Sequence, residues 1–156
     1  MANIMATIAN RGYYYTPHFV RGIGQGGPLP EYTQRHVTTV DPKYFESVIP
    51  GMQAVVDGRG GTGNFASLAQ FGISVAGKTG TVQNPHGDDH ATFAAFAPAE
   101  DPKIAIAVFI ENAGFGGTSA APLASLMIEK YLRGKVVRKR WEYWLQGSAD
   151  KFVKHR

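Results

Sequence analysis

Residues 75–82, with the sequence Val-Ala-Gly-Lys-Thr-Gly-Thr-Val, place one cation and two hydroxyl groups between β-branched residues. Such residues favour a β-strand, whose side chains alternate between its two faces. We therefore expect Lys78 and Gly80 on one face and Thr79 and Thr81 on the other. The glycine would allow close approach to the main chain. The segment is a candidate ligand site, and an ordinary half-exposed strand with a lysine on its wet face fits the same spacing.

The same stretch also matches a phosphate-binding loop, because Gly72–Thr79 fits the pattern GxxxxGK[ST]. Such a loop needs a strand before it and a helix that begins at the Lys-Thr pair, so that backbone N–H groups face the phosphate. Residues 65–71 are more helical than β in composition, and Pro85 follows too closely for a helix to open here. The context disfavours nucleotide binding, which stays open as an alternative.

The composition fits one ordinary domain or part of one, since the chain has 156 residues and is 44% hydrophobic. No apolar run is long enough to span a bilayer, and the absence of cysteine excludes disulfides and thiolate metal ligands. Residues 135–156 contain seven basic and two acidic residues, a balance of +5, whereas the remainder has a balance of −1. We therefore divide the chain into a body, residues 1–134, and a basic aromatic tail, residues 135–156.

Apolar residues at helical spacing predict helices over residues 1–10, 42–56 and 119–133. Asp41 should cap the second and Gly134 should end the third, whose apolar stripe is Leu123, Leu126, Met127, Lys130 and Tyr131. A short helical turn is expected over residues 64–70, an extended piece over 13–20, and loop over 21–40.

Strand patterns over residues 73–82, 91–97 and 103–110 predict an antiparallel three-strand meander. Small alanines alternate with Ile104, Ile106, Val108 and Ile110 in the last strand, so both of its faces should be covered. The predicted fold class is α/β of the α+β type, an antiparallel sheet flanked by helices.

The segment His86-Gly87-Asp88-Asp89-His90 contains residue types that bind metals. It has no cysteine and no helical frame that would place two ligands four residues apart. We therefore expect a hairpin loop here and no metal site.

Taken together, these segments resemble the penicillin-binding transpeptidases. Lys78-Thr79-Gly80 is the KTG signature of such enzymes. The motifs that accompany it include Gly61-Thr62-Gly63, Asp89-His90-Ala91, Phe96-Ala97-Pro98 and Ala120-Ala121-Pro122. The run is similar to the C-terminal part of class B enzymes of the elongation type and covers residues 1 to about 134.

The resemblance implies roles for four residues of the motif. Lys78 would supply positive charge near the nucleophile and the ligand carboxylate. Thr79 and Thr81 would bind that carboxylate, the backbone N–H of Thr81 would be an oxyanion-hole donor, and Gly80 would let a peptide stem or a β-lactam pair along the strand. Lys78 and Thr81 are thus the catalytic candidates, and Thr79, Gly80 and Thr81 bind substrate. The family chemistry needs no cofactor.

The resemblance further implies a D,D-transpeptidase that cross-links the peptide stems of peptidoglycan by serine acyl transfer and binds β-lactams. Its parent would work with elongation-complex proteins at the periplasmic face of the inner membrane. The family's Ser-x-x-Lys and Ser-x-Asn motifs precede KTG, whereas the one Ser-x-x-Lys here, Ser148–Lys151, follows it and is interpreted as chance. No Ser-x-Asn occurs. We therefore expect an incomplete, inactive fragment without the parent's membrane anchor, which exposes a sheet edge and can dimerise through it.

The basic tail offers another hypothesis, a non-enzymatic binding module. The composition of the tail fits a solvated helix, whose Trp141 and Leu145 pack on the body, better than it fits a binding module. We therefore expect no nucleic acid among the partners.

Overall fold

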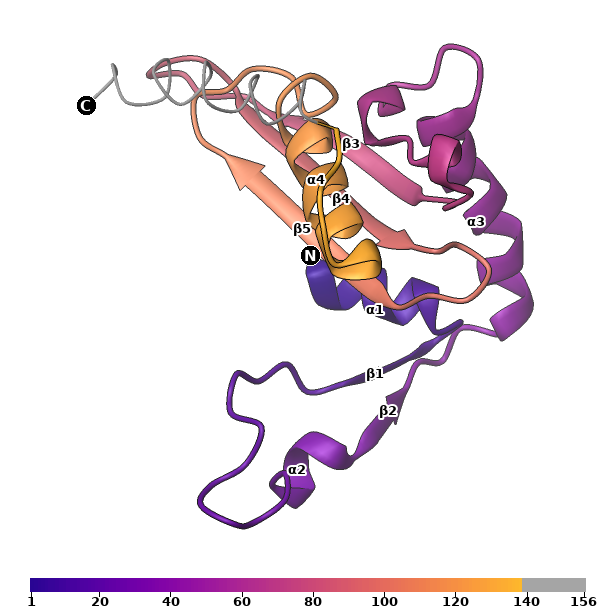
Figure 1. Cartoon of the computed structure of the whole chain (residues 1–156), viewed down its shortest axis with the longest axis vertical. Coiled ribbons are helices and arrows are strands. Elements are labelled where there is room, and N and C mark those ends of the chain that lie inside the picture. Colours follow the sequence, from indigo (N-terminus) through magenta and orange to yellow (C-terminus); the bar gives the residue numbers. More distant parts are fainter. Residues whose placement is uncertain (139–156) are drawn as a thin grey trace.

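A three-stranded antiparallel sheet forms the centre of the fold (Figure 1). The computed structural model describes residues 1–138. The sheet consists of β3 (Ala76–Val82), β4 (His90–Ala97) and β5 (Ile104–Ile110), hydrogen-bonded in the order β3-β4-β5. The predicted meander is confirmed.

The register of β3 on β4 determines which face each motif residue occupies. Thr79 pairs with Phe93, and Lys78 pairs with Ala94. Directly paired residues share a face, and the two faces alternate along a strand. Thr79 and Thr81 therefore lie on the face of Phe93, and Lys78 and Gly80 lie on the opposite face, as the sequence predicts.

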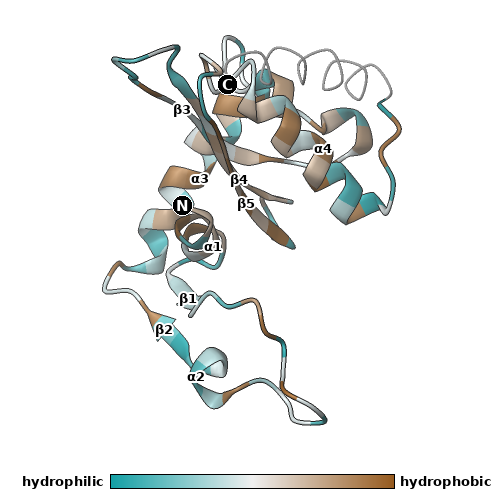
Figure 2. Cartoon of the chain, turned by 90° about the vertical axis from the view of Figure 1, so that its left-hand side faces the viewer, coloured by the Kyte–Doolittle hydropathy of each residue, from teal (hydrophilic) through white to brown (hydrophobic). Residues whose placement is uncertain are grey.

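Helices cover both faces of the sheet (Figure 2). Helix α4 (Ala120–Arg133) covers one face, and α1 (Ala2–Ala9) covers the other. Helix α3 (Pro42–Asp57) lies beside β3. The core on the α4 side includes Val56, Phe93, Val108, Ala124 and Ile128. The core on the α1 side includes Met5, Ile49, Met52, Ala94 and Phe96.

The ends of the helices follow the predicted signals. The carboxylate of Asp41 accepts a hydrogen bond of 3.0 Å from the N–H of Lys43 and so caps α3, which continues through Pro50. Gly134, with φ +74°, ends α4. Arg11 follows α1 with φ +57°. Its guanidinium bonds the carboxylate of Glu46 at 2.9 Å and the carbonyl of Ala99 at 3.3 Å, and thereby connects three distant segments.

The face of α4 that packs on the sheet differs from the predicted stripe. Leu126 is buried, but Met127 is 50% exposed and Tyr131 is 63% exposed. Ala121, Ala124, Ser125, Ile128 and Glu129 are buried instead. Ala121, Ala124 and Ile128 belong to the core that packs on the strands, and the two small alanines let the helix approach closely. Glu129 is instead bound by Arg133, Val137 and Arg138.

One face of β5 is covered only in part, so the prediction that both faces are covered is wrong. Ala105 is half-buried against the α1 side, whereas Ala107 and Phe109 are exposed. Helix α1 has eight residues and is therefore about 12 Å long, too short to cover the whole strand.

Residues 13–37 form an arm that projects from the sheet (Figure 1). In it, β1 (Tyr13–Tyr15) pairs with β2 (Arg35–Val37), and α2 (Pro30–Thr33) precedes β2. The expected loop over residues 21–40 is wrong at α2 and β2, because elements of three and four residues leave no periodic pattern. The expected turn over residues 64–70 is two 3₁₀ helices, η1 (Asn64–Ala66) and η2 (Ala69–Phe71).

No helix in residues 1–138 combines the length and the apolar character needed to cross a membrane.

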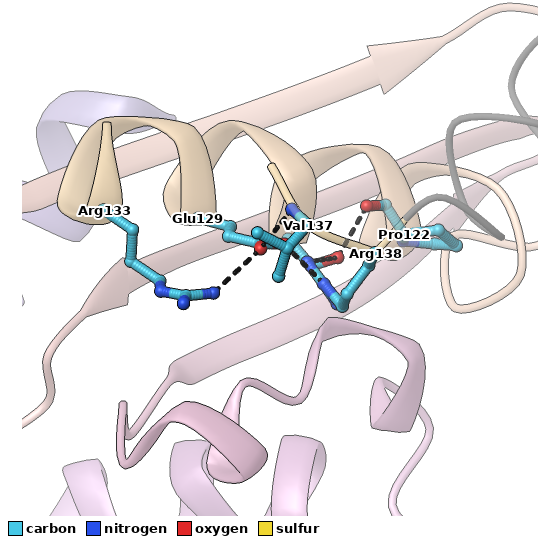
Figure 3. Close-up of polar contacts among 6 residues, drawn as sticks. Pro122, Glu129, Arg133, Val137 and Arg138 are labelled. Carbon is cyan, nitrogen blue, oxygen red and sulfur yellow. Dashed lines mark hydrogen bonds and ion pairs between the residues drawn. The ribbon is translucent and has the colours of Figure 1, made fainter. Parts of the chain in front are cut away.

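Residues 135–138 return alongside α4 and are bound to it through Glu129 (Figure 3). The fully buried carboxylate of Glu129 accepts hydrogen bonds from the N–H of Val137 at 2.9 Å and from the guanidinium groups of Arg138 at 2.6 Å and Arg133 at 3.1 Å. Arg138 also donates to the hydroxyl of Ser125 at 3.1 Å. We call these five residues the Glu129 cluster. The expected boundary at residue 134 separates α4 from two members of this cluster. Trp141, Leu145 and Ser148–Lys151 lie outside the described residues.

Candidate functional site

The four motif residues lie on β3, which is one edge of the sheet. Lys78 and Thr81 are exposed, and Thr79 and Gly80 are half-buried. The ammonium group of Lys78 donates a hydrogen bond of 2.6 Å to the carbonyl of Thr79. The strand therefore presents a cation and two hydroxyl groups within four residues, and solvent reaches all of them.

The hydroxyl of Thr79 has a partner that sequence reasoning did not single out. The Oγ1 atoms of Thr62 and Thr79 lie 2.8 Å apart, although 17 residues separate them in the chain. Thr62 belongs to the loop that follows α3, and it is exposed. The resemblance included Gly61-Thr62-Gly63 among the motifs that accompany KTG, but it gave Thr62 no role and no contact with Thr79.

Two glycines of β3 accommodate side chains of the neighbouring strand. A Cβ atom at Gly77 would lie 2.5 Å from the ring of Phe93, and one at Gly80 would lie 2.3 Å from the hydroxyl oxygen of Thr92. Real Cβ atoms do not approach other atoms so closely. The glycine at position 80 thus leaves room for the side chain of Thr92 on β4. It would also let a ligand approach the main chain of β3 closely.

The loop after β5 packs directly on the backbone near Thr79. A Cβ atom at Gly116 would lie 2.0 Å from the carbonyl oxygen of Thr92, and one at Gly117 would lie 2.1 Å from that of Thr62. Both glycines are buried. Their lack of side chains brings the loop after α3, β3 and the loop after β5 together, a contact that the glycines alone did not predict.

Residues 83–89 form the predicted hairpin loop between β3 and β4. The side chain of Asn84 donates to that of Asn112 at 2.7 Å, and the N–H of Asn112 donates to Nδ1 of His90 at 3.0 Å. These contacts hold the end of β5 against the hairpin. Residues 1–138 contain no group of three or more His, Asp or Glu side chains arranged to hold a metal.

The alternative of a phosphate loop at Gly72–Thr79 is wrong. Gly72, with φ +67°, ends η2, and Lys78 and Thr79 lie inside β3. A phosphate loop requires a helix to begin at that Lys-Thr pair, so that its free N–H groups meet the anion. In a strand these groups face sideways along the sheet.

The two serines nearest to β3 in sequence, Ser67 and Ser74, both donate to carboxylates. The Ser67 hydroxyl donates to Asp57 at 2.5 Å, and the Ser74 hydroxyl donates to Glu100. The hydrogen bond from Ser74 is the main cause that holds the pKa of Glu100 below its ordinary value. Neither hydroxyl is bonded to a lysine or a histidine of the kind that activates a nucleophilic serine.

Known proteins are similar to this chain in sequence and in fold. The family described as the penicillin binding protein transpeptidase domain matches residues 1–129. The peptidoglycan D,D-transpeptidase MrdA of Haemophilus influenzae is 34% identical to this chain, and the match covers 87% of this chain and 24% of that protein.

Solved structures agree with this assignment. Pseudomonas aeruginosa PBP2 in complex with WCK 5153 matches with a TM-score of 0.72 and 35% identity, over 88% of this chain and 30% of that one. An imipenem acyl-enzyme complex of penicillin-binding protein A from M. tuberculosis matches with a TM-score of 0.69 and 30% identity, over 84% of this chain and 29% of that one.

The predicted resemblance and fold class are confirmed by these matches. The chain spans about a quarter of the length of the curated relatives that it matches. Because the family covers most of residues 1–138, and the KTG strand lies at the sheet edge, this chain belongs to the penicillin-binding protein transpeptidase domain family.

Proposed function

We propose that this chain is part of a peptidoglycan D,D-transpeptidase that cross-links peptide stems by serine acyl transfer and is acylated by β-lactams. The observation that carries the proposal is the KTG sequence on an accessible edge strand, with the Thr79 hydroxyl held by a second hydroxyl. Relatives named D,D-transpeptidases and an acyl-enzyme complex among the similar structures support it.

In this proposal the four motif residues act on the ligand. Lys78 supplies positive charge, and the hydroxyls of Thr79 and Thr81 bind the ligand carboxylate. The N–H of Thr81 donates to the oxyanion, and Gly80 lets the ligand lie along the strand. Lys78 and Thr81 are the catalytic candidates. The exposure of Lys78 and Thr81 supports these roles, because a ligand can reach both.

The nucleophile of this proposal comes from another part of the protein. No Ser-x-x-Lys precedes KTG in these 156 residues, and Ser67 and Ser74 donate to carboxylates.

We also propose that the whole protein acts at the periplasmic face of the inner membrane, with an anchor outside this chain and with elongation-complex partners. The naming of its relatives as MrdA peptidoglycan transpeptidases supports an extracytoplasmic place of action. We further propose that the chain consists of a body, residues 1–134, and a basic tail, residues 135–156. Val137 and Arg138, at the start of this tail, are hydrogen-bonded to Glu129 of the body.

Incubation with a fluorescent penicillin and intact-mass spectrometry test this function. We expect no covalent adduct on residues 1–156 alone and one adduct on the full-length protein that contains them. In the full-length protein, Lys78→Ala should slow acylation by about a hundredfold, the cost of losing an electrostatic contact to the transition state. Lys103→Ala is the matched control, because Lys103 forms an exposed pair with Asp101 and should leave the rate unchanged. An adduct on the isolated chain would contradict the location of the nucleophile, and an unchanged Lys78→Ala rate would contradict the role of the lysine.

We propose that the isolated chain dimerises through the free edge of β5. Within residues 1–138 this strand pairs with β4 alone, and Phe109 on it is 53% exposed. Unpaired edges that carry apolar residues associate, and a lysine on the edge discourages association. In sedimentation velocity, wild type should therefore form dimers as concentration rises, and Phe109→Lys should shift this to higher concentration. Met127→Lys, an exposed change on α4, is the control. Equal self-association of all three chains would exclude the β5 edge.

A further inference from the structure

We propose that Thr62 is a positioning residue that orients the hydroxyl of Thr79 toward the anionic group of the ligand. The inference rests on the proposed function, since it concerns the ligand site on β3. It adds a residue outside the KTG motif. Thr62 is exposed and Thr79 half-buried, so a ligand that lies along β3 can reach the pair of hydroxyls.

The geometry of the pair determines which proton remains for the ligand. The two Oγ1 atoms lie 2.8 Å apart, a normal distance for a hydrogen bond between hydroxyls. Each hydroxyl has one proton to donate and two lone pairs that accept. When an anion accepts the proton of Thr79, the Thr79 oxygen is free to accept the proton of Thr62. The two hydroxyls and the anion then form a continuous chain of hydrogen bonds, in which each bond strengthens the next.

The backbone around Thr62 is held on two sides. The N–H of Gly63 donates to the carbonyl of Val55 at the end of α3, at 2.9 Å. On the other side, Gly117 packs so closely that a Cβ there would lie 2.1 Å from the carbonyl oxygen of Thr62. A hydroxyl on a mobile loop would lose much of its effect to conformational entropy. Contacts to α3 and to the loop after β5 reduce that loss, and so favour a positioning role.

A double-mutant cycle in the full-length protein tests the inference, with the second-order rate constant of acylation by a fluorescent penicillin as its readout. Thr62→Val removes the hydroxyl and nearly preserves side-chain volume, whereas Thr62→Ser keeps the hydroxyl. We expect Thr62→Val to lower the rate constant roughly tenfold, as the loss of one hydrogen bond would. Thr62→Ser should stay near the wild-type rate. In a Thr79→Val background, Thr62→Val should have no further effect, because it acts through Thr79.

Different failures have different meanings. If Thr79→Val slows acylation but Thr62→Val does not, or if their effects on the activation free energy add, the positioning role of Thr62 is wrong and the proposed function stands. If Thr62→Ser is as slow as Thr62→Val, the hydroxyl does not act and the role is equally wrong. If wild-type protein is not acylated at all, the proposed function fails and the inference fails with it. Equal melting temperatures of the variants show that the rates compare folded proteins.

Discussion

Glu129→Gln should lower the free energy of unfolding of the chain by about 3–5 kcal/mol. The substitution removes the buried negative charge that balances Arg138, whose side chain is only 9% exposed. A guanidinium left without its counter-ion in the interior is costly, because burial has already removed its hydration. Urea unfolding of the wild type and the variant measures the difference. Asp101→Asn is the matched control, since Asp101 pairs with Lys103 on the surface and such pairs contribute about 0–1 kcal/mol. A loss as small as that of the control would show that the Glu129 cluster does not stabilise the fold.

The dependence of stability on pH gives a second test of the same cluster. Burial raises the pKa of the Glu129 carboxyl, but the N–H of Val137 and the guanidinium groups of Arg138 and Arg133 outweigh it, so the pKa lies below its ordinary value of 4.5. A carboxyl whose pKa is lower in the folded state stabilises the fold fully above its unfolded pKa. That contribution is lost as the pH falls through the folded pKa. Below about pH 4.5 the wild type should therefore lose stability more steeply than Glu129→Gln. Parallel pH profiles would contradict this.

Phe93→Ala should also cost about 3–5 kcal/mol of unfolding free energy. Phe93 is fully buried on the central strand, and its ring occupies the space where a Cβ of Gly77 would lie. It also lies 3.1 Å from the position of a Cβ at Gly63, next to Thr62. The substitution therefore opens a cavity beneath the KTG strand. Phe109→Ala provides the control, because the ring of Phe109 is 53% exposed on β5 and its removal should cost clearly less.

The contact between Phe93 and Gly77 predicts that their substitutions do not add. Gly77→Ala alone should cost about 1–3 kcal/mol, because its new methyl group collides with the ring. In the Phe93→Ala background the ring is absent and the same change should cost less. Equal costs of Gly77→Ala in the two backgrounds would mean that the glycine is required by something other than this ring.

The sequence was sufficient for the parts of the fold that local chemistry determines. The strand patterns over residues 73–82, 91–97 and 103–110 predicted the meander that β3, β4 and β5 form. Asp41 and Gly134 marked helix ends because one side chain and one backbone angle satisfy the helix terminus. The alternation along β3 likewise predicted that Thr79 and Thr81 share a face, and the register with β4 confirms it.

The features that the sequence did not predict depend on packing between segments that are distant in the chain. Alanine and serine occur on both the inner and the outer faces of helices. The apolar pattern therefore predicted that the larger Met127 and Tyr131 would be buried, whereas Ala124 and Ser125 are buried in the structure. The hydrogen bond between Thr62 and Thr79 requires the chain to fold back over 17 residues. Gly116 and Gly117 pack tightly against distant backbone. A glycine-rich sequence is equally typical of a flexible loop, so the sequence around them did not predict this packing.

The contacts of Arg11 constrain the order in which this chain acquires its structure. The guanidinium bonds the carbonyl of Ala99, 88 residues further along, and α1 packs on β4 and β5. During synthesis at about 5–20 residues per second, α1 therefore precedes its final packing surface by roughly 5–20 seconds. Met5 and Ala9, which the sheet finally buries, have no native partner on it during that interval. Native packing of α1 is consequently a late, long-range event, and the closure of this long loop slows folding.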